Sequence, residues 1–180
     1  MLHRFCLLTY CIAAFLTAFS VNGAFAQADN PQITSRNFGD WSLRCRPASE
    51  SDKEGSNCEV ALTLQQRGEE GPIAKIAFGK PVPGELIQAL VIVPNNVGFP
   101  SSVKIVTESK DLPDIELAWR RCLPGGCFAE AKPNEQAIQK IRRLDGPGLL
   151  TFRDAQDHNV AVRISFKGLG QALEALEKTK

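Results

Sequence analysis

Hydrophobic and polar residues alternate in two neighbouring segments of the first half of the chain. In Phe38–Cys45, the residues Trp41, Leu43 and Cys45 fall on one side of an extended chain, and polar residues fall on the other. Apolar residues again take every second position in Cys58–Gln66. A period of two is typical of a strand with one buried face, so we predict two strands joined by a polar loop.

Further strand-like runs follow, separated by turns rich in Gly, Pro, Asn and Asp. They are Ile73–Phe78, Leu86–Val93, Val103–Thr107, Ile115–Arg121, Leu149–Arg153 and Val160–Phe166. In Leu86–Val93 both the odd-numbered and the even-numbered positions are mostly apolar, which predicts a central strand covered on both faces. Trp41 and Trp119 each share a face with aliphatic neighbours, so we expect both rings to anchor the core.

Helical periodicity occurs only near the C-terminus. Asn134 is a good N-cap for a first helix, which Gly146-Pro147-Gly148 would end. Its apolar positions have helical spacing and are Ala137, Ile138, Ile141 and Leu144. Its polar positions, including Arg142 and Arg143, are expected to point away from the core. A second amphipathic helix is predicted from Leu169, Ala172, Leu173 and Leu176.

Together these elements predict a mainly β fold. About eight or nine short strands with turn signals every 8–12 residues are typical of a β-sandwich or barrel. We predict an antiparallel β-sandwich with two short helices. The sequence contains no repeat or internal boundary, so residues 27–180 are expected to form one domain.

The first 26 residues have the three-part pattern of a secretory signal peptide. A short basic start precedes an apolar run from Phe5 to Phe19, and Ala24-Phe25-Ala26 is a small-x-small cleavage site. The run is short for a membrane span, which needs about 20 residues. A lipoprotein signal at Cys11 is disfavoured because bulky Tyr10 precedes it. We therefore predict export with cleavage after Ala26 and no membrane span in the mature chain.

The charge of the mature chain is balanced. Loss of Arg4 lowers the basic residues from 21 to 20, against 20 acidic residues. Nucleic-acid-binding domains are usually strongly basic, so we do not expect a nucleic-acid partner.

Signal-peptide cleavage removes Cys6 and Cys11. The cysteines that remain are Cys45, Cys58, Cys122 and Cys127. An even number in an exported chain indicates disulfides, and four cysteines allow three pairings. Cys45 and Cys58 lie on the apolar faces of adjacent strands at the two ends of one loop. Cys122 and Cys127 flank Leu-Pro-Gly-Gly, where the chain can reverse. We predict the pairs Cys45–Cys58 and Cys122–Cys127.

Two reactive interpretations of Cys122 and Cys127 compete with a structural disulfide. Arg120 and Arg121 could favour a thiolate, but redox pairs usually have two intervening residues and a helix at the first cysteine. The gaps of twelve and four residues also fit a zinc site poorly.

The mature chain has one histidine, His158, in an expected turn and no recognised catalytic motif. We therefore predict no catalytic residue, no metal and no cofactor.

Two clusters of basic residues could bind a partner. They comprise Arg120, Arg121, Lys140, Arg142 and Arg143. The simpler interpretation is a solvated strand end and helix face, and the alternative is a patch that meets an anionic envelope component.

Several segments together resemble the invasion-associated locus B family of exported proteins from Gram-negative bacteria. They are Phe38-Gly39-Asp40-Trp41 leading to Cys45, then Cys58, Pro94–Gly98, Cys122-Leu-Pro-Gly-Gly-Cys127-Phe-Ala129, and Ile164–Gly168 running into Gln171-Ala172-Leu173. The resemblance covers nearly the whole mature chain. Departures occur at Asn95-Asn96 and at Ser101-Ser102, where the family usually has a simpler Pro-x-Gly-Val step and a glycine.

The resemblance implies a periplasmic or envelope-associated β-rich domain with two disulfides, no established catalytic residues and a role in entering host cells. The resulting hypothesis is an exported, non-enzymatic interaction module whose partner is an envelope or host protein. The alternative is a periplasmic thiol-redox protein or another small enzyme.

Overall fold

The computed structural model describes residues 33–47, 57–65, 68, 71–81, 85–109 and 112–179. The chain divides into two units at Asn30 and Pro31, and all of the described residues belong to the second unit. The predicted signal peptide, residues 1–26, lies outside the described residues.

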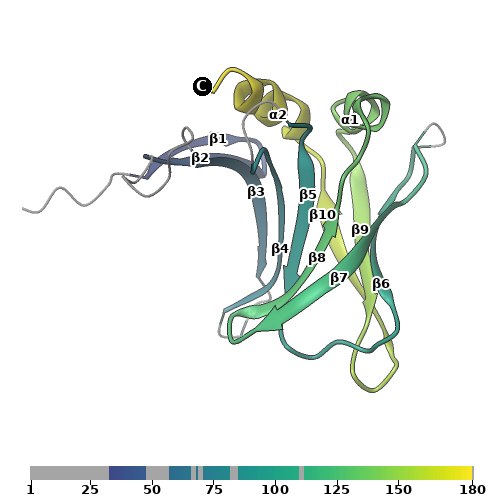
Figure 1. Ribbon diagram of the computed structural model, residues 1–180. Coiled ribbons are helices and arrows are strands. Elements are labelled where there is room, and N and C mark those ends of the chain that lie inside the picture. Colours follow the sequence, from purple (N-terminus) through teal and green to yellow (C-terminus); the bar gives the residue numbers. More distant parts are fainter. Residues whose placement is uncertain are drawn as a thin grey trace, which may run out of the picture. The chain divides into compact units, whose positions relative to one another are not determined.

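Ten antiparallel strands form one continuous sheet in the described part of the chain (Figure 1). Their bounds are β1 Thr34–Phe38, β2 Trp41–Arg46, β3 Asn57–Gln65, β4 Pro72–Gly79, β5 Gln88–Val93, β6 Ser102–Thr107, β7 Ile115–Leu123, β8 Gly126–Ala131, β9 Pro147–Arg153 and β10 Asn159–Ser165. The order across the sheet is β1-β2-β3-β4-β5-β8-β7-β6-β9-β10.

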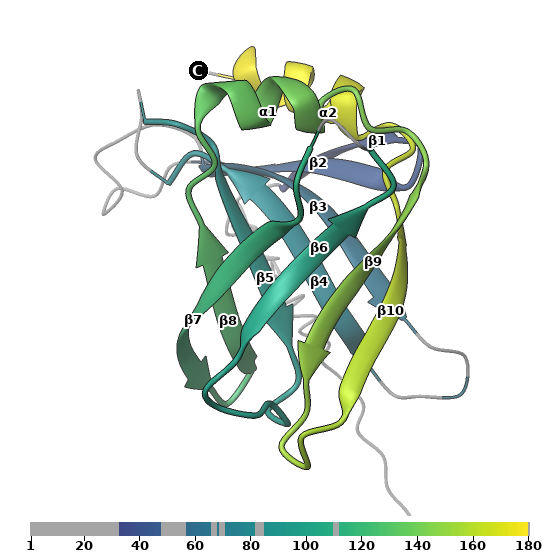
Figure 2. The same ribbon diagram turned by 90° about the vertical axis from the view of Figure 1, so that its right-hand side faces the viewer.

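The sheet bends so that its two halves face each other. In Figure 2, β6 and β9 lie in front of β3 and β4. Fully buried side chains come from both halves, among them Val60 and Ile76 on one side and Ile105 and Leu150 on the other. The predicted mainly antiparallel β fold with two helices is confirmed. The two layers are halves of one sheet.

Both helices lie at the same end of the sheet (Figure 1). In α1, Glu135–Ile141, the Asn134 side chain accepts a hydrogen bond of 2.8 Å from the Ala137 amide, as the N-cap prediction required. In α2, Leu169–Glu177, the four apolar residues predicted to form the inner face are all buried. This face packs against β1, β2 and β3, so α2 closes one end of the core.

Two strands have no clear sequence pattern. β1 is an edge strand whose first four side chains are exposed, so it carries no hydrophobic periodicity. β8 follows directly on the turn at Gly125, and it has too few apolar residues on its buried face to show a strand pattern. The expectation that Leu86–Val93 is covered on both faces is wrong. The strand begins at Gln88, and only Ala89, Val91 and Val93 are buried, while the other face is half-exposed.

The two ends of the sheet meet at one point. The Asp40 amide donates to the Lys167 carbonyl at 3.1 Å, and Trp41 Nε1 donates to the Ser165 carbonyl at 2.9 Å. Gly39 and Gly168, both with positive φ, allow the two turns to touch. A Cβ atom at Gly39 would lie 2.5 Å from the Lys167 carbonyl oxygen. This contact joins the β1–β2 turn to the segment that connects β10 with α2.

Candidate functional site

Both predicted disulfides are present. Cys45 of β2 lies directly opposite Cys58 of β3, and their Cα atoms are 4.0 Å apart. Cys122 of β7 lies opposite Cys127 of β8, with a Cα distance of 3.9 Å. Each bond therefore joins facing residues of neighbouring strands. Neither pair lies at a helix N-terminus, where redox-active cysteines are commonly activated.

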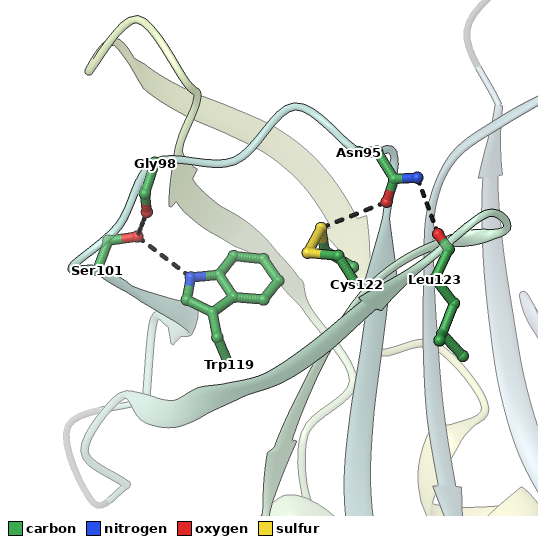
Figure 3. Close-up of a disulfide and its surroundings, with 7 residues drawn as sticks. Asn95, Gly98, Ser101, Trp119, Cys122 and Leu123 are labelled. Carbon is green, nitrogen blue, oxygen red and sulfur yellow. Dashed lines mark hydrogen bonds between the residues drawn. A yellow bond between two sulfur atoms is a disulfide. The ribbon is translucent and has the colours of Figure 1, made fainter.

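The loop between β5 and β6 packs against the second disulfide (Figure 3). Asn95 Nδ2 donates to the Leu123 carbonyl at 2.8 Å, and Asn95 Oδ1 lies 3.4 Å from Cys127 Sγ. A disulfide sulfur carries no hydrogen, so the contact with sulfur is close packing rather than a hydrogen bond. Further along the loop, Trp119 Nε1 donates to Ser101 Oγ at 3.1 Å, and Ser101 Oγ donates to the Gly98 carbonyl. These contacts hold the β7–β8 hairpin in place.

We expect both disulfides to be structural. Replacing Cys45 and Cys58 by serine should lower the free energy of unfolding by about 3 kcal/mol, and replacing Cys122 and Cys127 should lower it by about 2 kcal/mol, because a shorter loop loses less entropy on closure. Urea unfolding of the two double variants measures both values. Mass spectrometry after alkylation should find no free thiol in the mature protein until it is reduced. Alkylation of the unreduced protein at Cys122 would contradict the structural role.

His158 belongs to a local turn between β9 and β10. The Asp154 carboxylate accepts hydrogen bonds from the amides of His158 at 2.8 Å and Gln156 at 2.9 Å. The bond from the His158 amide is the main cause that lowers the pKa of Asp154 below its ordinary value. His158 Nδ1 lies 3.2 Å from Asp154 Oδ2, and its side chain is exposed. The pair therefore orders the turn.

The five basic residues of the predicted partner patch divide between two places. Arg120 and Arg121 lie on β7, where Arg120 Nε is 3.5 Å from Glu130 Oε2 and the Arg121 guanidinium lies 5.4 Å from the centre of the Phe128 ring. Lys140 and Arg143 line a separate hollow of about 420 Å³ at the end of α1.

Arg142 does not point away from the core as predicted. Its side chain is only 15% exposed and forms an ion pair with Glu177 of α2. The pattern of α1 alone could not show that a second helix lies beside it. Arg142 therefore joins the two helices.

A larger hollow lies on the outer face of the sheet, on the side away from the core. We call it the outer-face groove. It has a volume of about 670 Å³, and the lining residues that matter here are Ser35, Arg44, Arg46, Lys75, Lys80 and Leu90. They come from β1, β2, β4, β5 and the residue after β4. In Figure 1, β1 and β2 run at a steep angle to the lower parts of β3 and β4.

An ion pair crosses the floor of the outer-face groove. Lys75 Nζ lies 2.6 Å from Glu59 Oε1. In the strand register Lys75 faces Thr63 and Glu59 faces Gly79, and the pair Ala61–Ala77 lies between these two positions. The ion pair therefore passes over both alanines, which are 3% exposed although they lie on the outer face. The stem of a lysine can cover apolar surface in this way.

Other cations of the outer-face groove form no ion pair with any described residue. Among the described residues, Arg44, Arg46 and Lys80 have no acidic partner within salt-bridge distance. The sequence showed Arg44 on the polar face of its strand. It did not show that β4 and β5 complete a hollow beside this face, because that depends on strand order.

Within the described ranges, no helix is long and apolar enough to cross a membrane. The same ranges contain no group of three or more His, Cys, Asp or Glu residues placed to hold a metal ion.

Comparison with known proteins identifies the family. Residues 41–177 match the family model described as invasion associated locus B (IalB) protein. The chain belongs to the IalB family. Two invasion protein B homologues of Brucella abortus, from strain 2308 and from biovar 1 strain 9-941, are each 23% identical over 168 residues, covering 92% of this chain and 93% of theirs. The crystal structure of invasion associated protein B from Bartonella henselae has a TM-score of 0.64 and 17% identity, covering 80% of this chain and 96% of that one. It shows that the fold is shared.

The segments that carry the IalB resemblance meet in pairs in the structure. Phe38–Trp41 contacts Ser165–Gly168 where the ends of the sheet join. Pro94–Gly98 packs against the Cys122–Cys127 hairpin (Figure 3). Both pairs fix the position of chain segments, so these IalB markers are explained by the fold.

Proposed function

We propose that this IalB-family protein is an exported, non-enzymatic interaction module of the bacterial envelope, which binds a protein or envelope component and contributes to association with a host cell. The observation that carries the proposal is the outer-face groove. It combines a volume typical of binding sites with cations that have no ion-pair partner in the described residues. Charged groups of this kind remain available to a partner.

The chemistry of the remaining groups supports binding over catalysis. All four mature cysteines are held in disulfides between facing strand residues. His158 is an exposed turn residue, and among the described residues its side chain contacts the Asp154 carboxylate. Nucleophilic catalysis needs a base within hydrogen-bond reach of the nucleophile, and neither group supplies such a pair. A location in the periplasm or at the outer envelope is consistent with the sequence of residues 1–26.

Crosslinking in intact cells tests the proposal. A membrane-permeable amine crosslinker should join the protein to a defined envelope component, which mass spectrometry of the purified adduct would identify. A cysteine-free variant is unsuitable as a control because it should be destabilised. A variant with the signal peptide deleted is suitable, since it stays in the cytoplasm and should lose the adduct. Failure to form any adduct in the envelope would overturn the proposed function.

The basic residues at the end of α1 provide a separate test. If they meet an anionic partner, replacing Lys140 and Arg143 by glutamate should reduce the yield of the crosslinked adduct several-fold, because both attractive charges become repulsive. Arg142 should be left intact, since its ion pair with Glu177 joins the helices. Circular dichroism should confirm that the variant is folded. An unchanged yield would show that these two cations do not contribute to binding the partner.

A further inference from the structure

We propose that the outer-face groove binds an extended acidic segment of a partner protein, with carboxylates of the segment pairing with Arg44 and Arg46. The inference rests on the proposed function and names the surface and the chemistry of the partner. It places the main contact away from the basic residues at Arg120, Arg121 and α1.

The spacing of the two arginines favours an extended chain. Arg44 and Arg46 project from the same face of β2, and both are exposed. Side chains two residues apart on a strand are separated by about 6.8 Å, and the same distance separates alternate residues of an extended ligand. Acidic residues at positions i and i+2 of such a ligand can therefore face both guanidinium groups at once. Each guanidinium can donate two parallel hydrogen bonds to one carboxylate.

The first disulfide holds these arginines in position. Cys45 lies between Arg44 and Arg46 in β2, and its bond to Cys58 ties this part of the strand to β3. Cys58 itself lines the groove. Groups that are fixed before binding lose less conformational entropy when the partner arrives, which increases affinity.

The rest of the groove suits a peptide better than a lone anion. Leu90 supplies an apolar contact, and Gln88 supplies hydrogen-bonding groups. Measured across the strands from β1 to β5, the groove is at most about 19 Å wide, since neighbouring strands lie about 4.8 Å apart. A phosphate ion would leave most of this surface uncovered. Glu59 and Glu130 also line the groove, but each is already paired with a cation, Glu59 with Lys75 and Glu130 with Arg120, so the unpaired arginines remain for the ligand.

Fluorescence anisotropy of the purified protein tests the inference. The probe is a fluorescein-labelled peptide of about eight alternating Glu and Leu residues, long enough when extended to run along β2 past both arginines. The double variant Arg44→Glu, Arg46→Glu should bind it at least about tenfold more weakly than the wild type. The matched control, Lys104→Glu with Arg163→Glu, changes the net charge equally at exposed strand positions outside the groove and should change affinity less than about twofold. Replacing Cys45 and Cys58 by serine should weaken binding in a variant shown to be folded.

Several outcomes would overturn the inference. Equal loss of affinity in both double variants would mean that the peptide responds only to net charge. Equal binding of an alternating Lys and Leu peptide would rule out recognition of carboxylates. Binding of phosphatidylglycerol vesicles that depends on Arg44 and Arg46, without binding of the acidic peptide, would assign the groove to a lipid headgroup.

The crosslinking experiment separates this inference from the proposed function. If the Arg44→Glu, Arg46→Glu variant forms the same envelope adduct as the wild type, the groove assignment is wrong and the interaction module stands. If the wild type forms no adduct, the proposed function itself fails. Loss of the adduct in the groove variant, with its retention in the Lys104→Glu, Arg163→Glu control, supports both.

Discussion

Replacing Trp41 by alanine is expected to lower the free energy of unfolding by about 3–5 kcal/mol, the usual cost of removing a large aromatic side chain from a core. The Trp41 ring is 1% exposed, and its centre lies 5.7 Å from that of Phe78. Its Nε1 atom also donates to the Ser165 carbonyl at 2.9 Å. The substitution would therefore remove core volume and one of the two hydrogen bonds described above that join the β1–β2 turn to the segment at the end of β10. Urea unfolding followed by circular dichroism measures the loss.

Two matched variants separate the contributions of Trp41. Trp41→Phe keeps most of the apolar volume but leaves the Ser165 carbonyl without this donor, so we expect a smaller loss than for alanine. Trp119→Ala removes the same side chain from a half-buried position and should cost less than Trp41→Ala. An equal loss at both tryptophans would contradict the placement of Trp41 at the centre of the core.

Replacing Gly168 by alanine is expected to cost at least about 2 kcal/mol, because positive φ strains any residue with a Cβ atom and backbone crowding adds to that strain. Gly168 has φ +86°, and an added Cβ would overlap the carbonyl of Phe38. The two turns would have to separate, which would disturb the contact between Asp40 and Lys167. Thermal and urea unfolding report the change.

Gly68 provides the control for Gly168. It has nearly the same φ, +88°, but beyond its two chain neighbours no atom of the described residues lies within 4 Å of the position that a Cβ would occupy. Gly68→Ala should therefore show the cost of backbone strain alone, about 1 kcal/mol. Similar losses at Gly68 and Gly168 would mean that contact between the two turns adds no stability.

The sequence was sufficient to predict the fold class, because most strands and both helices have one buried face. Period-two alternation located β2 and β3, and helical spacing located the buried face of α2. The disulfides followed from the positions of their cysteines at strand ends and beside a reversal. These features depend on local pattern and short sequence separation.

Features that depend on strand order could not be predicted in the same way. The sequence shows that Arg44 is outward, but the groove exists because β4 and β5 lie on the same concave face. The pair Lys75–Glu59 and the pair Arg142–Glu177 are likewise formed between elements whose proximity no local pattern reveals. For this reason the predicted partner patch consisted of basic residues that are close together in the sequence. The cations of the outer-face groove instead come from separate strands.

The joining of the two ends of the sheet has a consequence for how the chain must fold. Trp41 and Ser165 are 124 residues apart, and α2, which covers the same end of the core, comes later still. A chain that crosses a membrane from its N-terminus onwards cannot complete this core until its final residues have emerged. If the chain is exported as we propose, this late closure would keep it unfolded, and so able to be threaded, until the full length has been delivered.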